Sequence, residues 1–258
     1  MEKRAHIESL LGRDRWIIAA CLTGVALLAW AYILAGAGMD MSMPGMVMAP
    51  MTWSPAVALL MFIMWWVMMI AMMVPSAAPT ILLFAKIRAS KAATDQASIG
   101  AATFLAGYLV IWGAFSALAT GLQWGLERIE LMAMGMRLSS PLLAGTILLT
   151  AGLYQFTPIK AACLKHCQSP VLFLSTHWRR GAAGAFLMGT RHGIYCLGCC
   201  WVLMALLFVG GIMNLLWVAG LAAYVALEKL TSGTIWLARA IGAALCGAGV
   251  VALSGAIR

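Results

Sequence analysis

The sequence predicts an all-α protein, a polytopic bundle of about seven transmembrane helices. Of its 258 residues, 64% are hydrophobic and 10% are charged, and the mean hydropathy is +0.96. A soluble domain carries roughly 25% charged residues, so this chain has too few polar side chains to cover a globule of its size. The composition therefore argues against a soluble enzyme and favours one membrane domain in contact with the lipid bilayer.

Seven apolar stretches along the chain predict the spans. A helix needs about 20 apolar residues to cross a hydrocarbon core of roughly 30 Å. The first stretch follows basic residues and ends in small ones, but it is longer than the apolar region of a signal peptide, so we interpret it as an anchor. The sixth is the shortest. The predicted spans are 16–37, 56–84, 99–122, 141–159, 193–211, 214–228 and 235–254.

The basic residues predict the orientation. With residues 1–15 in the cytoplasm, thirteen Lys and Arg fall on the cytoplasmic side, Lys160 and Lys229 among them, and three fall outside. Lysine and arginine are enriched in cytoplasmic loops. The asymmetry predicts a multi-pass protein of the bacterial inner membrane, with one membrane domain over 16–258 and a loop at 38–55 outside. It also explains the net charge of +9 without a nucleic-acid partner.

Methionine is concentrated in the predicted outer loop. Six of the 19 methionines lie there within thirteen residues, and Pro44, Gly45 and Pro50 oppose a regular helix. Thioether sulfur binds Cu(I) without losing a proton and is a poor ligand for Zn²⁺. We therefore interpret the loop as a site that captures copper outside the cell, with gap filling near lipid as the alternative. The methionines are Met39, Met41, Met43, Met46, Met48 and Met51.

A stripe of methionines follows in the second predicted span. Met61, Met64, Met68 and Met72 are spaced 3, 4 and 4 residues apart, which places them on one face of a helix. Two interpretations stay open. The stripe is either a ladder of weak copper sites or a packing surface inside the bundle.

Cysteine and histidine gather in two motifs on the predicted cytoplasmic side. The ligand residues lie at positions i, i+3 and i+4 of the first motif, and at i, i+4, i+7 and i+8 of the second. At these spacings the ligands of each motif share one face of a helix. The two faces together would supply up to seven soft or borderline ligands, which suits Cu(I), with tetrahedral Zn²⁺ as the alternative. CLKHCQSP contains Cys163, His166 and Cys167, and RHGIYCLGCCW contains His192, Cys196, Cys199 and Cys200.

Packing and redox chemistry are the alternatives for these thiols. Burial as small hydrophobes explains Cys21 and Cys246 but not five of seven cysteines in one 38-residue window. Cys196 and Cys199 form a CxxC, the spacing of thiol–disulfide exchange. Because the cytoplasm keeps thiols reduced, a membrane thiol–disulfide oxidoreductase is the minor alternative, and we expect no enzyme. His177 is predicted to lie at the membrane interface, outside the metal site.

Two charged residues end the sixth predicted span. Charges inside a membrane are costly and need partners. We expect Glu228 and Lys229 to form a charge pair with Arg239 at the interface, with a pore-facing carboxylate as the alternative. Small residues at Gly189 and Gly193 have the spacing of close helix contacts.

The sequence resembles a bacterial family of integral membrane proteins predicted to bind metal. The resemblance covers roughly residues 55–250 and rests on WWVMMIAMMVPSAAPT, YQFTPIKAACLKHCQSP, HWRRGAAGAFLMGTRHGIYCLGCCWVLM and the EKL that ends the sixth span. It implies metal binding but fixes neither the metal nor the activity. The matching residues are Cys163, Cys167, Cys196, Cys199 and Cys200.

These observations predict a protein that binds Cu(I) at outer methionines and moves or delivers it to the inner Cys/His cluster. Thioethers bind Cu(I) more weakly than thiolates, so the ion would travel toward tighter sites. No Walker motif is present, so ATP would not drive the step. The alternative is an accessory subunit or metal-insertion factor for a membrane metalloenzyme. The expected partner is that metalloenzyme or a cytoplasmic metallochaperone.

Overall fold

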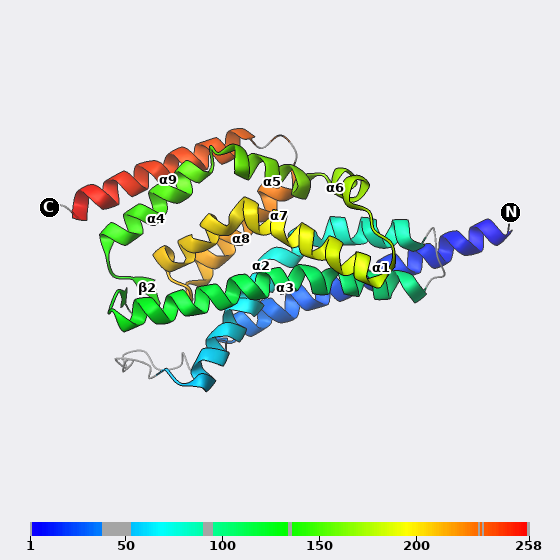
Figure 1. Cartoon of the computed structure of the whole chain (residues 1–258), viewed down its shortest axis with the longest axis horizontal. Helices are drawn as coiled ribbons and strands as arrows, with labels where there is room; N and C mark the ends of the chain where they lie inside the picture. Colours follow the sequence, from blue (N-terminus) through cyan, green and yellow to red (C-terminus); the bar gives the residue numbers. More distant parts are fainter. Residues whose placement is uncertain are drawn as a thin grey trace.

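The structure is a computed structural model that describes residues 2–37, 53–89, 95–133, 136–231, 233 and 235–256, without the side chains of 2–15, 95–97 and 256. This part of the chain is helical apart from one short hairpin, which confirms the predicted all-α class (Figure 1). The helices are α1 (Glu2–Leu34), α2 (Pro55–Ala89), α3 (Asp95–Arg128), α4 (Pro141–Tyr154), α5 (Pro158–Gln168), α6 (Pro170–His177), α7 (Gly181–Gly210), α8 (Leu215–Leu230) and α9 (Ile235–Ala256). The hairpin pairs β1 (Met132–Ala133) antiparallel with β2 (Arg137–Leu138).

Three long helices, α2, α3 and α7, form the centre of the bundle. α3 lies along α7, α2 packs against α3, and α1 covers α2 (Figure 1). α4 and α9 run side by side along the opposite edge, where α4 also contacts α7. α5 packs on α7, and α8 packs on α2. α5 and α8 therefore complete the interior between the long helices.

Five described helices are long and apolar enough to cross a membrane: α2, α3, α7, α9 and the part of α1 from Trp16 to Leu34. The predicted fourth span is broken, because α4 and α5 meet at an angle of 66° and make a sixth span only if taken together. The break has a local cause. Pro158 cannot continue α4, and the Thr157 hydroxyl accepts a hydrogen bond from the Lys160 backbone N–H at 3.3 Å to begin α5. α8 has 16 residues, fewer than the roughly 20 that cross a bilayer. The seven spans and the orientation remain predictions.

Glycines let α3 and α7 approach closely. A Cβ atom on Gly189 would lie 1.9 Å from the Phe104 carbonyl oxygen, and one on Gly107 would lie 2.2 Å from that of Phe186. Gly193 faces the Ile111 side chain in the same contact. The close contact predicted at Gly189 and Gly193 is therefore present, and it sets the distance between the two helices.

Gly189→Ala tests this contact. The new methyl group would push α3 away from α7, and overpacking of this kind costs roughly 1–3 kcal/mol. Gly220→Ala in α8 is the matched control, because its Cβ would meet no atom within 4 Å and alanine favours a helix. Thermal unfolding of the full chain in detergent should show a lower midpoint for Gly189→Ala. The midpoint of Gly220→Ala should not fall below that of the wild-type protein. Equal midpoints would contradict the close packing.

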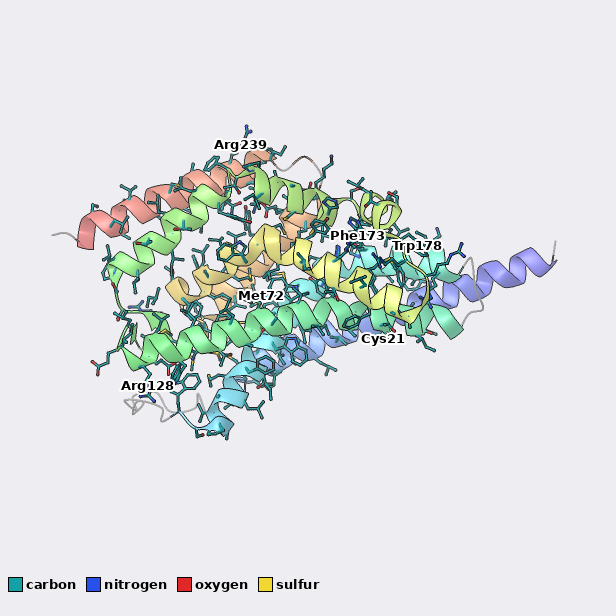
Figure 2. The ribbon with its side chains drawn as sticks, viewed as in Figure 1. Cys21, Met72, Arg128, Phe173, Trp178 and Arg239 are labelled. Carbon is teal, nitrogen blue, oxygen red and sulfur yellow. The ribbon has the colours of Figure 1, made fainter. Side chains whose placement is uncertain are left out.

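A buried ion pair joins α5 to α8. Lys160 Nζ lies 2.7 Å from a carboxylate oxygen of Glu228, and both side chains are buried. The Tyr224 hydroxyl donates to the same carboxylate at 3.3 Å. The expected pairing of Glu228 with Arg239 is wrong, because the bend before α5 brings Lys160 to α8, while Arg239 is exposed at the edge of α9 (Figure 2).

Glu228→Gln should destabilise the fold by about 3–5 kcal/mol, because it leaves the Lys160 ammonium buried without its counter-charge. The double variant Lys160→Met/Glu228→Leu removes both charges and should be much less destabilised. Denaturant unfolding of the three proteins in detergent measures the difference. If the double variant lost as much stability as the single one, the ion pair would have no specific role.

Candidate metal centre

The central helix α7 carries four of the predicted ligands into the interior. His192, Cys196, Cys199 and Cys200 are each 2% exposed or less. The thiols of Cys199 and Cys200 donate to the Cys196 carbonyl at 3.1 and 2.9 Å, one helical turn earlier. All four therefore lie on the side of α7 that neighbouring helices cover, as their spacing predicts.

The ligand face of α5 packs on the ligand face of α7. The Cys167 thiol interacts with those of Cys196 and Cys199. The Cys163 sulfur lies against Gly198, 2.7 Å from the position of a Cβ there. The two faces that the sequence places on separate segments thus meet. We refer to Cys167, Cys196, Cys199 and Cys200, with Lys229 and Met73 beside them, as the thiol pocket.

His166 lies beside the thiol pocket and contacts an aromatic ring instead of the thiols. Its ring stacks on that of Tyr195, with centroids 4.1 Å apart and planes 2° apart. His192 lies closer to the pocket, one turn before Cys196, and its Nδ1 atom is buried with no hydrogen-bond partner among the described residues. The structure therefore separates the predicted thiols from one of the two predicted imidazoles.

Lys229 belongs to the site, although the sequence motifs did not predict it there. Its side chain is 3% exposed, and its ammonium donates to the sulfur atoms of Cys196 at 2.9 Å, Met73 at 3.4 Å and Cys200 at 3.5 Å. An ammonium has three N–H donors, and here three sulfur atoms accept them. The available signal was a lysine at the end of an apolar helix, since buried charges in membrane proteins are typically functional.

Tyr108 from α3 completes the surroundings of Cys196. Its hydroxyl lies 3.0 Å from the Cys196 sulfur and 3.2 Å from the Met73 carbonyl oxygen, to which it donates. The surroundings of the Cys196 sulfur thus include groups from four helices, α2, α3, α7 and α8. The buried positive charge of Lys229 needs acceptors of high electron density, and the surrounding sulfur atoms supply them.

The methionine stripe lies inside the bundle. Met61, Met64, Met68 and Met72 are all 2% exposed or less, and Met72 is labelled in Figure 2. Burial agrees with both packing and a ladder of weak sites. Met73, one position beyond the stripe, is the methionine that contacts Lys229. The outer-loop residues Met39, Met41, Met43, Met46, Met48 and Met51 lie outside the described residues.

In the part of the chain that the structure describes, no three His, Cys, Asp or Glu side chains converge in the arrangement that holds a metal ion. The thiols instead contact one another and the Lys229 ammonium. The Lys229 ammonium, a monovalent cation, thus lies among the sulfur atoms of Cys196, Cys200 and Met73. The ligand types suit Cu(I), which is also monovalent and prefers sulfur.

A family model described as "PpoB2: Copper chaperone" matches residues 62–252, from the methionine stripe through α9. No curated protein and no solved structure matches the chain. The matched region contains the whole thiol pocket and the helices α5, α6 and α8, and the outer loop precedes it. The match confirms the metal-binding family that the sequence motifs suggest and adds copper as its metal. The chain belongs to the PpoB2 family of copper chaperones.

Proposed function

We propose that this protein holds Cu(I) in the thiol pocket and delivers it to an acceptor protein. One observation carries the proposal: the sulfur atoms of Cys196, Cys200 and Met73 surround the buried charge of Lys229. Two thiolates and a thioether are ligands that favour Cu(I) over harder ions. Membership of a copper chaperone family supports the same ion and the same task.

Charge also favours Cu(I) over Zn²⁺ in this pocket. Two thiolates with Cu(I) carry one negative charge, which the Lys229 ammonium balances when it moves aside on its flexible stem. The same thiolates with Zn²⁺ are neutral, so Lys229 would leave one uncompensated positive charge. Because the pocket is buried, that charge would be costly. We therefore propose Cu(I) as the ion, with Zn²⁺ as the weaker competitor.

We propose that copper moves inward, from the outer methionines to the thiol pocket. The protein would be a multi-pass protein of the bacterial inner membrane, with its N-terminus in the cytoplasm. Two of the thirteen basic residues that support this orientation, Lys160 and Lys229, are buried, but the asymmetry of the others remains large. Since thiolates bind Cu(I) more tightly than thioethers, the direction is downhill in affinity. The acceptor would be a membrane metalloenzyme or a cytoplasmic metallochaperone.

Burial disfavours thiol redox catalysis. Cys196 and Cys199 are 1% and 0% exposed, so a protein disulfide could not reach them without the helices separating. Catalytic cysteines are normally accessible to their substrate. We propose a carrier with no enzymatic step, and keep disulfide exchange as the alternative.

Cys196→Ser and Cys200→Ser should each weaken Cu(I) binding at least about tenfold, because each removes a thiolate ligand. Cys21→Ser is the matched control, since Cys21 is exposed on α1. Competition with a chromogenic Cu(I) chelator, using the full chain in detergent without oxygen, measures the affinities. Wild-type protein without bound copper, or a Cys196→Ser variant with unchanged affinity, would refute the proposal.

Lys229→Leu should shift the preference from Cu(I) toward Zn²⁺ by at least about tenfold, or about 1.4 kcal/mol, because the compensating charge is lost. Lys229→Arg keeps the charge and should stay near the wild-type ratio. Parallel Cu(I) and Zn²⁺ competition assays give the ratio of affinities. An unchanged ratio in Lys229→Leu would show that charge balance does not select the ion.

A further inference from the structure

Two histidines lie together beside the thiol pocket. His166 on α5 and His177 at the end of α6 have ring centroids 5.9 Å apart, with planes at 68°. Both are partly exposed, unlike the thiols. His177 is predicted from sequence to be an interfacial residue and His166 a ligand of the thiol cluster. The structure places them instead with each other and with Tyr195.

The backbone fixes the same tautomer in both imidazoles. His166 Nδ1 lies 3.1 Å from the Ala162 carbonyl oxygen, and His177 Nδ1 lies 3.1 Å from that of Phe173. A carbonyl oxygen only accepts, so each contact requires a proton on Nδ1. The Thr176 hydroxyl also lies 2.8 Å from His177 Nδ1, and since it donates to the Leu172 carbonyl oxygen at 2.8 Å, it accepts from this nitrogen. Each Nε2 then keeps its lone pair. Histidines that bind metals typically have this arrangement, with the second nitrogen held by a carbonyl or carboxylate.

Aromatic side chains hold the two rings in place. His166 is stacked on Tyr195, and His177 is stacked on Phe173 with centroids 5.1 Å apart (Phe173 is labelled in Figure 2). Two imidazoles on opposite sides of one metal ion, at roughly 2.0 Å per nitrogen, have centroids about 6 Å apart. The observed 5.9 Å fits this value. The Tyr195 hydroxyl lies 3.5 Å from His177 Nε2, a long contact that a metal ion would displace at small cost.

A buried imidazole connects this pair to the thiol pocket. The His192 ring lies 4.9 Å from the Phe173 ring, on which His177 stacks. His192 is also one helical turn before Cys196, and its Nδ1 has no partner among the described residues although the side chain is 2% exposed. A buried nitrogen without a hydrogen bond is costly and calls for an occupant. His192 thus connects to the exposed pair through Phe173 and to Cys196 through α7.

We propose that His166 and His177 form a second Cu(I) site, at which the ion leaves the thiol pocket for the acceptor protein. The identity of the ion rests on the function proposed for the thiol pocket. Imidazole nitrogens bind Cu(I) less tightly than thiolates, so the site would hold the ion only briefly. Its partial exposure makes the ion accessible to ligands of another protein, which the buried pocket does not allow.

Titration of the full chain in detergent with one and then two equivalents of Cu(I), without oxygen, tests the site. Copper X-ray absorption separates sulfur ligands at about 2.3 Å from nitrogen ligands at about 2.0 Å. The six outer-loop methionines are changed to leucine for this titration, because their thioethers are also proposed to bind Cu(I). We then expect the first equivalent to show sulfur and the second to show nitrogen. His166→Gln and His177→Gln should each weaken the second equivalent at least about tenfold and leave the first unchanged, which also shows that both variants fold. His6→Gln, a control far from both histidines in the sequence, should keep both.

Three results would overturn the second site: a chain without the outer-loop methionines that binds one equivalent only, a second equivalent unchanged in both glutamine variants, or a second equivalent lost equally in His6→Gln. Failure of the proposed function looks different. In that case the first, sulfur-bound equivalent is missing from the wild-type protein, whatever happens at the imidazoles.

Discussion

The contact between the Lys229 ammonium and three sulfur atoms is the interaction on which the candidate site depends. A buried ammonium is costly unless each of its N–H groups has an acceptor. The positions of the neighbouring sulfur atoms are therefore constrained by that of the ammonium. Because Cys196 and Cys200 lie on α7 and Met73 lies on α2, the contact joins three helices. One residue earlier, Glu228 pairs with Lys160 of α5. Successive residues of a helix point about 100° apart, so the end of α8 is fixed on two sides.

The departures from regular spans build the site. The break at Pro158 turns α5 across α7, which brings Cys167 to Cys196 and Lys160 to Glu228. The last turn of α8 buries Glu228 and Lys229 and so presents Lys229 to the thiols. The long helices supply the frame, because the glycine contact between α3 and α7 brings Tyr108 within 3.0 Å of the Cys196 sulfur. A bundle of unbroken spans would not bring these groups together.

The ligand types change in order along the molecule. Thioethers lie along α2, thiols lie where α5 packs on α7, and imidazoles lie on α5 and α6. Sulfur ligands suit Cu(I) best, and imidazole accepts it more weakly. In the proposed function, this order would give a tight internal site with weaker sites on both sides of it, which is the arrangement a carrier needs to load and release an ion. Burial of the thiols would protect them from other reactions during the proposed delivery.

The sequence by itself determined the helical class, the copper-type ligands and the two ligand faces, since these follow from composition and from the 3.6-residue period. It also located the close contact at Gly189. The tertiary structure decided the partners. Glu228 and Lys160 are 68 residues apart, and their pairing depends on the bend before α5; His166 joins His177 rather than the thiols for the same reason. Periodicity is local and says which side chains share a face. The rotation and crossing of helices, which decide what that face meets, arise from packing across the whole bundle.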